Sequence, residues 1–517
     1  MKPIWQLHDT LIASAEMYPG KIAFIVEGKE YSYKKTCYDV FRLANALAIS
    51  GLKRGDRVAI YLDNTYVNVI SFYATLVAGG AFIIINPQTK SDKLEYILND
   101  SEAKILVTDS HLFARISPVF DSCKHLHGMF YSVSDGNLES PEKEGCFTRE
   151  LFNLLECTDP VSQPVSTIPN DLAALIYTSG STGNPKGVMM SHQSMLFAAR
   201  IISHYLRLDN SHILINVLPL AFDYGLYQVL MSVVHGATLV LERSFNYPAQ
   251  ILKRVTDYSV TVFPGVPTIY ATLISMHRRK PLFFPTVTRI TNTAAALPPD
   301  YTEELHEIFP NALIYRMYGL TECKRVCYLE PEKADMKPTS VGKAIPGTEI
   351  LILDSDGNEC KPNETGILHV RGSHVMMGYW KEPELSTKML KKGIYPGERI
   401  LCTHDWFRKD EDGDLYFLGR SDDIIKSRGE KVSPVEVENV LISMKGVRES
   451  AVIGISDDLL GQAIKAFVVL DDTSISEQMI KKHCNDRLEN FMVPKYIEIV
   501  QMLPKTESGK ITKKGLK

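Results

Sequence analysis

The feature that most constrains this chain is a polar loop between two apolar runs, Tyr177–Gly187, with the sequence YTSGSTGNPKG. Its eleven residues include three glycines, four serine or threonine hydroxyls and one lysine. Glycines allow backbone N–H groups to converge on an anion, hydroxyls add donors, and the lysine adds a positive charge. The loop is therefore predicted to bind a polyphosphate. The alternative, a flexible glycine–serine turn, leaves the lysine and the many hydroxyls unexplained.

The residue order distinguishes this loop from the common phosphate loop. In that motif, a Gly-Lys pair is followed directly by Ser or Thr and opens a helix. Here Lys186 is followed by Gly187 and then by the apolar run Val188–Met190. Such a run is typical of a strand, so the loop is predicted to join two strands.

Composition indicates a soluble globular protein and excludes several partners. Of the 517 residues, 45% are hydrophobic and 23% are charged, and this length suggests about three domains. The net charge of −4 gives no electrostatic reason to expect a nucleic-acid partner. The nine cysteines are scattered, odd in number and free of Cys-x-x-Cys pairs. This pattern favours reduced thiols in a cytoplasmic protein and argues against zinc.

Neither a signal peptide nor a membrane span is predicted. The N-terminal sequence MKPIWQ lacks the apolar core of a signal peptide. A stretch of 26 residues, Asn64–Thr89, carries no charge, but polar residues interrupt it and Gly79-Gly80 breaks it. It is predicted instead to form a helix, a turn at the glycines and a buried strand over Ala81–Ile85.

The pattern of helices and strands changes twice along the chain. From about residue 40, helix-like stretches alternate with Val- and Ile-rich runs, as in layered α/β domains. Around residue 345, short strands with turn signals begin, which predicts a small β-rich subdomain over about 340–419. After a charged join at Gly419–Lys426, a capped helix begins at Ser433-Pro434, and strands and another helix follow.

The predicted fold class is therefore α/β with a division near residue 420. A large N-terminal part, residues 1–419, contains the layered α/β subdomains and the β-rich subdomain. A small α+β domain occupies residues 420–517.

Three further groups carry candidate chemistry, and each is unspecific alone. Tyr318-Gly-Leu-Thr-Glu322 offers an aromatic ring, a glycine, a hydroxyl and a carboxylate, which suit base stacking, phosphate approach and Mg²⁺ binding. Thr403-His-Asp405 is predicted to end a strand, with Asp405 suited to a pair of ribose hydroxyls. Lys510 lies on a glycine-containing loop near the C-terminus, where a lone lysine is usually just solvated.

In this order and spacing, the motifs resemble one family over essentially the whole chain. The chain is similar to the AMP-forming adenylating enzymes, which include acyl-CoA synthetases, adenylation domains and luciferases. Such enzymes join a carboxylic acid to ATP, giving an acyl-adenylate and pyrophosphate, and pass the acyl group to a thiol. The matching segments are Leu76–Phe82, Tyr177–Gly187, Leu218–Gly225, 292–298, Tyr318–Glu322, Thr403–Asp405, Gly419–Asp423, Lys426–Pro434 and Pro504–Lys510.

The resemblance implies ATP and Mg²⁺ as cofactors and a role for each matching residue. The residues that would hold the β- and γ-phosphates are Thr178, Ser179, Gly180, Ser181, Thr182, Gly183 and Lys186. Those expected around the adenine are Tyr318, Gly319, Ala294 and Ala295. Asp405 would contact the ribose, Arg420 the ribose or a phosphate, Thr321 the α-phosphate, and Glu322 the metal. At His404 the family more often has glycine, a departure that affects the expected geometry near the ribose.

The resemblance also implies that Lys510 is the catalytic lysine, acting with Thr321 and Glu322. The substrate carboxylate and the α-phosphate are both anionic, and a lysine between them favours the charge distribution that develops as pyrophosphate leaves. The C-terminal domain, 420–517, is expected to be mobile and to rotate at the hinge Asp422. That rotation would bring the loop Arg428–Lys431 into the site for the thiol step.

The acid pocket is less well determined. Asp223 falls where amino-acid-activating members have an aspartate that pairs with the substrate amine. Lys324 and Arg325 come shortly after Glu322 and are expected near the pocket wall. There they could pair with Asp223 or hold a second substrate carboxylate. Other expected lining residues, which do not describe a long apolar tunnel, are Tyr224, Tyr227, Thr291, Thr293 and Met317.

Three functions remain compatible with the sequence. The favoured one is a ligase that activates an amino acid or small polar acid for transfer to the phosphopantetheine of a carrier protein in trans. The alternative is an acyl-CoA synthetase, which uses coenzyme A as the acceptor. The third is a nucleotide-binding protein without catalysis, which the presence of Lys510, Glu322 and Asp405 disfavours.

Overall fold

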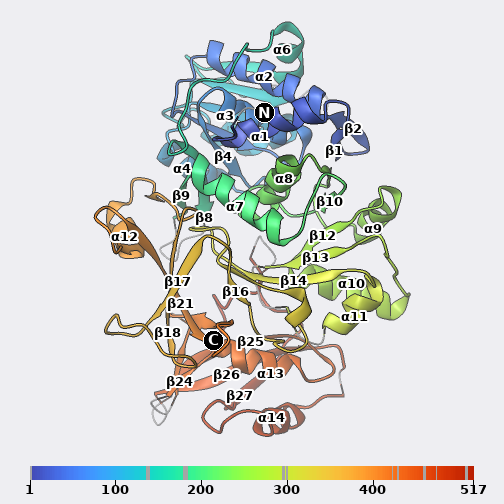
Figure 1. Ribbon diagram of the computed structural model, residues 1–517, viewed down its shortest axis with the longest axis vertical. Coiled ribbons are helices and arrows are strands. Elements are labelled where there is room, and N and C mark those ends of the chain that lie inside the picture. The colour runs from blue at the N-terminus through green and yellow to red at the C-terminus, as the bar shows by residue number, and fades with distance from the viewer. Residues whose placement is uncertain are drawn as a thin grey trace. The chain divides into compact units, whose positions relative to one another are not determined.

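The computed structural model divides into two compact units, and each is described separately (Figure 1). Unit one comprises Met1–Phe263, Leu320–Arg325 and Gly372–Lys391. Unit two comprises Pro264–Gly319, Val326–Arg371 and Lys392–Lys517. The structure describes residues 3–134, 140–178, 184–293, 297–298, 301–421, 423–427, 430–457, 461–472, 474–506 and 510–517.

The first sheet of unit one has eight strands in the order β19-β9-β8-β4-β3-β5-β6-β7. The strands from β8 to β7 run parallel, whereas β9 is antiparallel to β8 and β19 is antiparallel to β9. Strands β3, β4 and β5 are buried along their whole length, as expected for a parallel sheet covered on both faces. The bounds are β3 (Arg57–Tyr61), β4 (Ala81–Ile85), β5 (Ile105–Asp109), β6 (Gly128–Ser132), β7 (Phe147–Glu150), β8 (Leu172–Thr178), β9 (Lys186–Ser191) and β19 (Gly378–Tyr379).

The uncharged stretch 64–89 forms the helix, turn and strand that its sequence predicts. Helix α3 (Tyr66–Val77) is buried throughout and leads into β4 through Gly79, whose φ of +80° favours glycine. A Cβ on Gly80 would lie 2.9 Å from the carbonyl oxygen of Asp56, so the turn also needs its second glycine. In the described part of the chain, no helix combines the length and hydrophobicity needed to span a bilayer.

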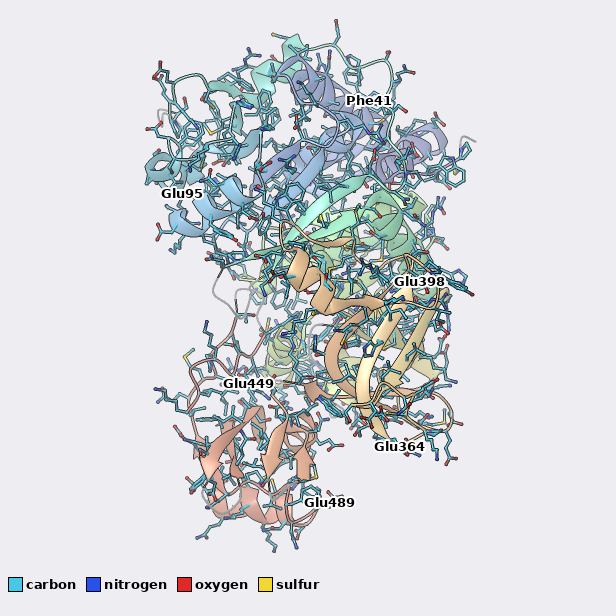
Figure 2. The ribbon with its side chains drawn as sticks, turned by 90° about the vertical axis from the view of Figure 1, so that its left-hand side faces the viewer. Phe41, Glu95, Glu364, Glu398, Glu449 and Glu489 are labelled. Carbon is cyan, nitrogen blue, oxygen red and sulfur yellow. The ribbon has the colours of Figure 1, made fainter. Side chains whose placement is uncertain are left out.

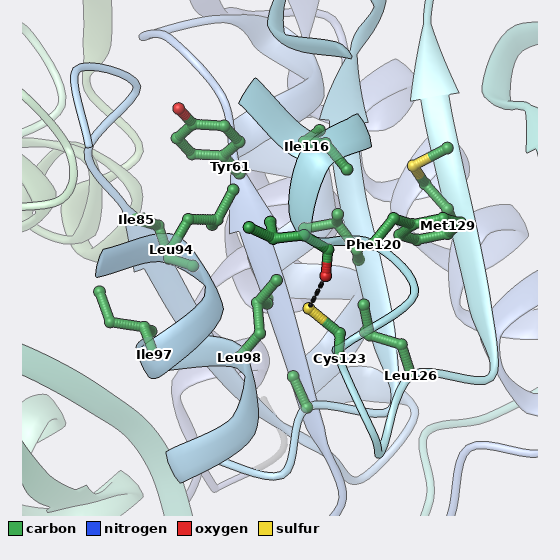
Figure 3. Close-up of a cluster of buried hydrophobic side chains, with 14 of the residues drawn as sticks. Tyr61, Ile85, Leu94, Ile97, Leu98, Ile116, Phe120, Cys123, Leu126 and Met129 are labelled. Carbon is green, nitrogen blue, oxygen red and sulfur yellow. Dashed lines mark hydrogen bonds between the residues drawn. The ribbon is translucent and has the colours of Figure 1, made fainter. Parts of the chain in front are cut away.

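One face of this sheet packs against α4 (Ser91–Asp100) and the short helix α5 (Phe113–Ile116). Figure 3 shows the resulting core, which contains Leu94, Ile97 and Leu98 of α4 together with Tyr61 of β3 and Met129 of β6. The Sγ of Cys123 donates to the carbonyl oxygen of Val119 at 3.1 Å within the same core. This packing fixes the position of α4, whose last residue, Asp100, lies near the phosphate-loop hairpin.

Unit one also contains strands of a second sheet, in the order β12-β10-β11-β1-β2. The boundary between the units falls within β12, after Phe263. Helices α1, α7 and α8 lie next to one another in this part (Figure 1). The bounds are α1 (Leu7–Met17), β1 (Ile22–Val26), β2 (Lys29–Ser32), α2 (Tyr33–Ile49), α7 (His192–Tyr205), β10 (Ile213–Asn216), α8 (Asp223–His235), β11 (Thr238–Leu241) and β12 (Val262–Gly265).

Unit two contains β13 (Arg289–Asn292) and β14 (Leu313–Tyr318), which run parallel, and then β15 (Cys327–Leu329) and β16 (Lys343–Ala344). Helices α10 (Pro267–Arg279) and α11 (Tyr301–Ile308) belong to the same part. The ion pair between Arg278 and Glu304 at 2.7 Å joins these two helices.

A second sheet, almost entirely in unit two, contains β17 (Thr348–Leu353), β18 (Thr365–Gly372), β21 (Arg399–Lys409) and β22 (Leu415–Arg420), within the span predicted to be rich in strands. Arg371 crosslinks this region, because its guanidinium contacts Glu349 at 2.6 Å and Glu398 at 2.5 Å (Glu398 is labelled in Figure 2). The remaining elements are η1 (Ser110–Leu112), η2 (Ser117–Val119), α6 (Leu151–Cys157), α9 (Pro248–Asp257), η3 (Pro331–Lys333), α12 (Pro383–Met389) and β20 (Leu390–Lys392).

The C-terminal residues form a sheet of their own in the order β24-β23-β26-β25, with β27 parallel to β26. Ser433 caps α13 by accepting a hydrogen bond from the N–H of Glu436 at 3.2 Å, as its sequence predicts. The fold class, a mixed α/β chain with a large N-terminal and a small C-terminal domain, is confirmed. The bounds are β23 (Ile425–Ser427), β24 (Glu430–Val432), α13 (Pro434–Ile442), β25 (Val447–Asp457), β26 (Gly461–Leu470), α14 (Glu477–Asn485) and β27 (Tyr496–Ile499).

Candidate active site

The glycine-rich loop lies between two antiparallel strands of unit one. Thr178 at the end of β8 is opposite Lys186 at the start of β9, and Tyr177 is opposite Gly187. The predicted strand–loop–strand arrangement is therefore confirmed at both ends of the loop. The predicted phosphate ligands at its centre, Ser179, Gly180, Ser181, Thr182 and Gly183, lie outside the described residues.

Three hydrogen bonds anchor the base of this hairpin. The Tyr177 hydroxyl donates to Oδ2 of Asp100 at 2.5 Å, and the indole N–H of Trp380 donates to the carbonyl oxygen of Asp100 at 2.9 Å. The backbone N–H of Trp380 donates to Gly187 at 2.8 Å. Gly187 is tightly enclosed, because a Cβ there would lie 3.2 Å from the Tyr177 ring and 3.3 Å from Trp380. Both strands are thus tied to the same helix end.

The predicted α-phosphate and metal residues, Thr321 and Glu322, are partly buried in unit one. The Tyr379 hydroxyl donates to Oε1 of Glu322 at 2.6 Å, and the N–H of Met376 donates to the Glu322 carbonyl oxygen at 2.7 Å. Burial, and then the charge of Glu322, raises the pKa of Tyr379, so its hydroxyl stays protonated. Sequence reasoning missed Tyr379, Trp380 and Asp100. For Tyr379 and Trp380, the only local signal was a pair of adjacent aromatic residues directly after Gly378.

The predicted adenine and ribose residues meet in unit two. The Tyr318 hydroxyl donates to Oδ2 of Asp405. The Tyr318 ring lies edge-on to Phe407, with centroids 4.8 Å apart, and is stacked on Phe417 at 5.7 Å. Arg420 is opposite Asp405 across β21 and β22, with its Nε 3.8 Å from the Asp405 carboxylate. The side chain of Arg420 is 72% exposed, whereas Asp405 is buried.

The segment Thr403–Asp405 does not end a strand, and this prediction was wrong. Strand β21 continues to Lys409, and the register against β18 shifts between Ile367 and His369, which leaves residues 403–405 in a bulge. A bulge redirects side chains and often lies beside an active site. Its His404 has φ of +57°, a left-handed conformation that glycine adopts without strain. This conformation suits the glycine that the resemblance leads us to expect at this position.

Five of the predicted acid-pocket residues lie in unit one. Lys324 is 2% exposed, and its Nζ lies 3.3 Å from Oδ2 of Asp223, which is 25% exposed. The same Nζ lies 4.6 Å from the ring centre of Tyr227 and 5.6 Å from that of Tyr224. Arg325 is also buried. Of the two alternatives for Lys324, internal pairing with Asp223 is therefore the one observed. Asp223 therefore has a cationic partner within the protein, and its pairing with a substrate amine stays a prediction.

The other predicted pocket residues lie in unit two. Thr291, Thr293 and Met317 are all buried, with Thr291 opposite Tyr315 in the β13–β14 pair. The hydroxyl of Tyr270 donates to the carbonyl oxygen of Thr291 at 2.8 Å, which fixes this end of β13. Ala294 and Ala295, predicted beside the adenine, lie outside the described residues.

The predicted catalytic lysine, Lys510, is exposed on the C-terminal segment of unit two. Its backbone is held by Thr506, whose N–H donates to the Lys510 carbonyl oxygen at 2.7 Å and whose hydroxyl accepts from the Lys510 N–H at 3.2 Å. The predicted hinge residue, Asp422, lies outside the described residues. So do Arg428 and Gly429 of the loop that is predicted to enter the site in the thiol step. The roles of Lys510 and Asp422 remain predictions.

One acidic cluster elsewhere resembles a metal site in composition. Asp410, Asp412 and Asp414 in unit two are the only such group found among the described residues. The Nζ of Lys337 lies 2.8, 2.7 and 2.7 Å from their carboxylates. These contacts raise the pKa of Lys337, led by the hydrogen bond to Asp410. The lysine therefore supplies the positive charge that the three carboxylates require.

Comparisons with known proteins agree with this arrangement. A family model described as AMP-binding enzyme matches residues 11–380, and one described as AMP-binding enzyme C-terminal domain matches residues 436–510. A long-chain-fatty-acid–CoA ligase from Bacillus subtilis (strain 168) is 30% identical over 99% of this chain and 94% of its own length.

Two solved structures are similar over nearly the whole fold. The anthranilate CoA ligase AuaEII in complex with anthranoyl-AMP has a TM-score of 0.89 at 27% identity, covering 99% of this chain and 96% of that one. ATP-bound MatB from Rhodopseudomonas palustris has a TM-score of 0.87 at 27% identity, covering 98% and 97%.

The fold, the glycine-rich hairpin and these similarities together define an AMP-forming acid–thiol ligase. The chain belongs to the AMP-binding enzyme family, the AMP-forming adenylating enzymes that include the acyl-CoA synthetases.

Proposed function

We propose that this protein is an acid:CoA ligase, which uses ATP to convert a carboxylic acid to an acyl-adenylate and transfers the acyl group to coenzyme A. The observation that carries the choice of an acid without an amine is the ion pair between Lys324 and Asp223 at 3.3 Å. An aspartate that already has a lysine partner does not require a cationic substrate. The similar proteins named above as CoA ligases support the same choice.

In the first half-reaction, the acid's carboxylate oxygen forms a bond to the α-phosphorus of ATP, and pyrophosphate leaves. We expect Thr178 and Lys186, at the ends of the hairpin loop, to bind the β- and γ-phosphates, and Thr321 to bind the α-phosphate. Lys510 stabilises the negative charge that shifts to the bridging oxygen. The similarity to ATP-bound MatB supports ATP as the nucleotide.

The donor set at Glu322 fits Mg²⁺, which prefers oxygen ligands. Oε1 of Glu322 accepts the hydrogen bond from Tyr379, and among the described residues Oε2 has no such partner. Mg²⁺ bound there would offset negative charge on the phosphates. Glu322 itself provides the anionic oxygen, and its neighbour Thr321 provides a hydroxyl donor.

In the second half-reaction, the thiolate of coenzyme A attacks the acyl carbon, the acyl–oxygen bond to the phosphate breaks, and AMP leaves. The proton of the thiol is lost to solvent. The hinge Asp422 and the loop Arg428–Lys431 belong to this step, since a rotation of the C-terminal domain would withdraw Lys510 and bring that loop into place. The thiol step would therefore follow formation of the adenylate.

The decisive test measures both half-reactions across a panel of acids. ATP–pyrophosphate exchange is followed with fatty, aryl, dicarboxylic and amino acids, and AMP release is then measured with either coenzyme A or a phosphopantetheinylated carrier protein. We expect exchange with acids that lack an amine, and AMP release that depends on coenzyme A. Exchange confined to amino acids, with acylation of the carrier alone, would overturn the proposal in favour of an amino-acid-activating ligase.

A further inference from the structure

We propose that Tyr379 is a positioning residue for nucleotide activation, which holds the Glu322 carboxylate in the orientation needed for the metal and ties it to the phosphate-loop hairpin. This inference rests on the proposed role of Glu322. Tyr379 itself does not touch substrate or metal, and it acts through the carboxylate that it contacts.

The first observation is that two bonds hold Glu322 from one short segment of unit one. The side chain is fixed by the Tyr379 hydroxyl at 2.6 Å from Oε1, and the main chain by the N–H of Met376 at 2.7 Å from the carbonyl oxygen. Tyr379 is only 6% exposed, so water competes little for the hydroxyl. A hydrogen bond between a neutral donor and a carboxylate is shorter and stronger than one between neutral groups.

The second observation is that the same segment also holds the hairpin. In β19, Gly378 is opposite Met189 and Tyr379 is opposite Val188 of β9. The N–H of Met377 donates to Met189 at 2.9 Å, and that of Trp380 donates to Gly187 at 2.8 Å. Residues 376–380 therefore contact Glu322 on one side and the strand that leaves the phosphate loop on the other.

The far end of the segment is fixed as well. The backbone N–H of Tyr379 donates to the hydroxyl of Ser386 at 2.8 Å, and that hydroxyl donates to the carbonyl oxygen of Glu382 at 2.7 Å. Gly378 has φ of +139°, and a Cβ there would lie 3.0 Å from the same hydroxyl. The tyrosine ring is consequently supported by its own backbone, as a group that positions another residue must be.

The geometry of the hydrogen bond restricts Tyr379 to this role, because its hydroxyl has a single proton to donate and donates it to Oε1 of Glu322. It engages one carboxylate oxygen and leaves Oε2 without a hydrogen-bond partner among the described residues. Groups that orient a metal ligand through a hydrogen bond typically change metal affinity or activity by roughly 10–100-fold when removed.

The test replaces Tyr379→Phe, which keeps the ring and removes the hydroxyl. We expect the Mg²⁺ concentration for half-maximal pyrophosphate exchange to rise roughly tenfold, with most of the rate recovered at high Mg²⁺. A second readout does not need turnover. Binding of Mn²⁺·ATP to the protein enhances the relaxation of water protons, and the variant should need correspondingly more protein or Mn²⁺ to reach half of the full enhancement.

The matched control is Tyr66→Phe. Tyr66 is also 6% exposed in unit one, and its hydroxyl donates to the buried carboxylate of Asp39 at 2.8 Å. This variant loses an equivalent tyrosine–carboxylate bond outside the proposed site, so its Mn²⁺ and Mg²⁺ dependence should match the parent. An equal loss of Mn²⁺ affinity in both variants would mean that the effect is general destabilisation, and would overturn the inference.

Two more variants separate this inference from the assignment on which it depends. Glu322→Gln should weaken Mn²⁺·ATP binding, and adding Tyr379→Phe to it should cause no further loss, since the tyrosine acts through that carboxylate. Additive losses in the double variant, or parent-like Mn²⁺ binding by Tyr379→Phe, would refute the positioning role. Parent-like binding by Glu322→Gln alone would instead refute the metal assignment of the proposed function.

Discussion

His192 should make the stability of this protein depend on pH in a direction that its surroundings determine. It is the first residue of α7, it is buried, and its Nδ1 accepts a hydrogen bond from the N–H of Leu7 at 3.2 Å. Its ring meets that of His8 edge-on, with centroids 5.7 Å apart. Burial, followed by the nearby His8, lowers the pKa of His192 to about 3.

The sign and size of the effect follow from this lowered pKa. The folded protein keeps His192 neutral while the unfolded chain takes up a proton below about pH 6.5, so the stabilisation is complete above that pH and is lost as the pH falls toward 3. At pH 5.5, one unit below the unfolded pKa, the loss amounts to about 1.4 kcal/mol.

The assay is guanidinium chloride unfolding at pH 7.5 and pH 5.5, for the parent and for His192→Asn, whose side-chain oxygen can still accept from Leu7. Between these two pH values the free energy of unfolding of the parent should fall by about 1.4 kcal/mol more than that of the variant. Taking the difference removes contributions from other titrating groups, since both proteins share them. An identical pH dependence for parent and variant would refute the reasoning.

Three further predictions concern the proposed reaction. Lys510→Ala should lose adenylation by about 10²–10³-fold yet still convert a supplied acyl-adenylate to thioester, and parent-like pyrophosphate exchange would contradict its role. Asp422→Pro should leave adenylation largely intact and stop thioester formation, whereas equal loss of both steps would indicate misfolding. Gly187→Ala should force Tyr177 and Trp380 apart, cost about 1–3 kcal/mol in unfolding experiments and raise the KM for ATP. An unchanged KM would show that the loop tolerates the shift.

The parts of the fold that could be predicted from sequence are those with a local signal. Gly79-Gly80 separates a helix from a strand, so the uncharged stretch around it could be assigned before any contact was known. The apolar runs on both sides of the phosphate loop predicted its two strands in the same way. The charged join after β22 and the Ser433 cap marked where a new group of elements begins.

The contacts that organise the site could not be predicted, because they join residues far apart in the chain. Tyr177 and Asp100 are 77 positions apart, and Tyr379 and Glu322 are 57 apart. A single tyrosine has no periodicity that reveals its partner. The choice between an internal and a substrate partner for Asp223 depends on a distance to Lys324, which only the fold provides.

The bulge at residues 403–405 shows how a local error arises. The run of apolar residues stops at Cys402, so the sequence suggests the end of a strand. Pairing with β18 nevertheless resumes at Trp406, pairing with β22 begins at Asp405, and the strand continues to Lys409. Sheet pairing does not require apolar side chains at every position. The positive φ of His404 is the physical reason for the interruption.

The attachment of the phosphate loop to Asp100 has a practical consequence for protein engineers. A loop grafted into another host of this fold as residues 177–187 alone would arrive without the acceptor at the end of α4 and without the indole that reaches it. The graft would also have to include Asp100 and Trp380, although these two residues are 280 positions apart in the donor chain.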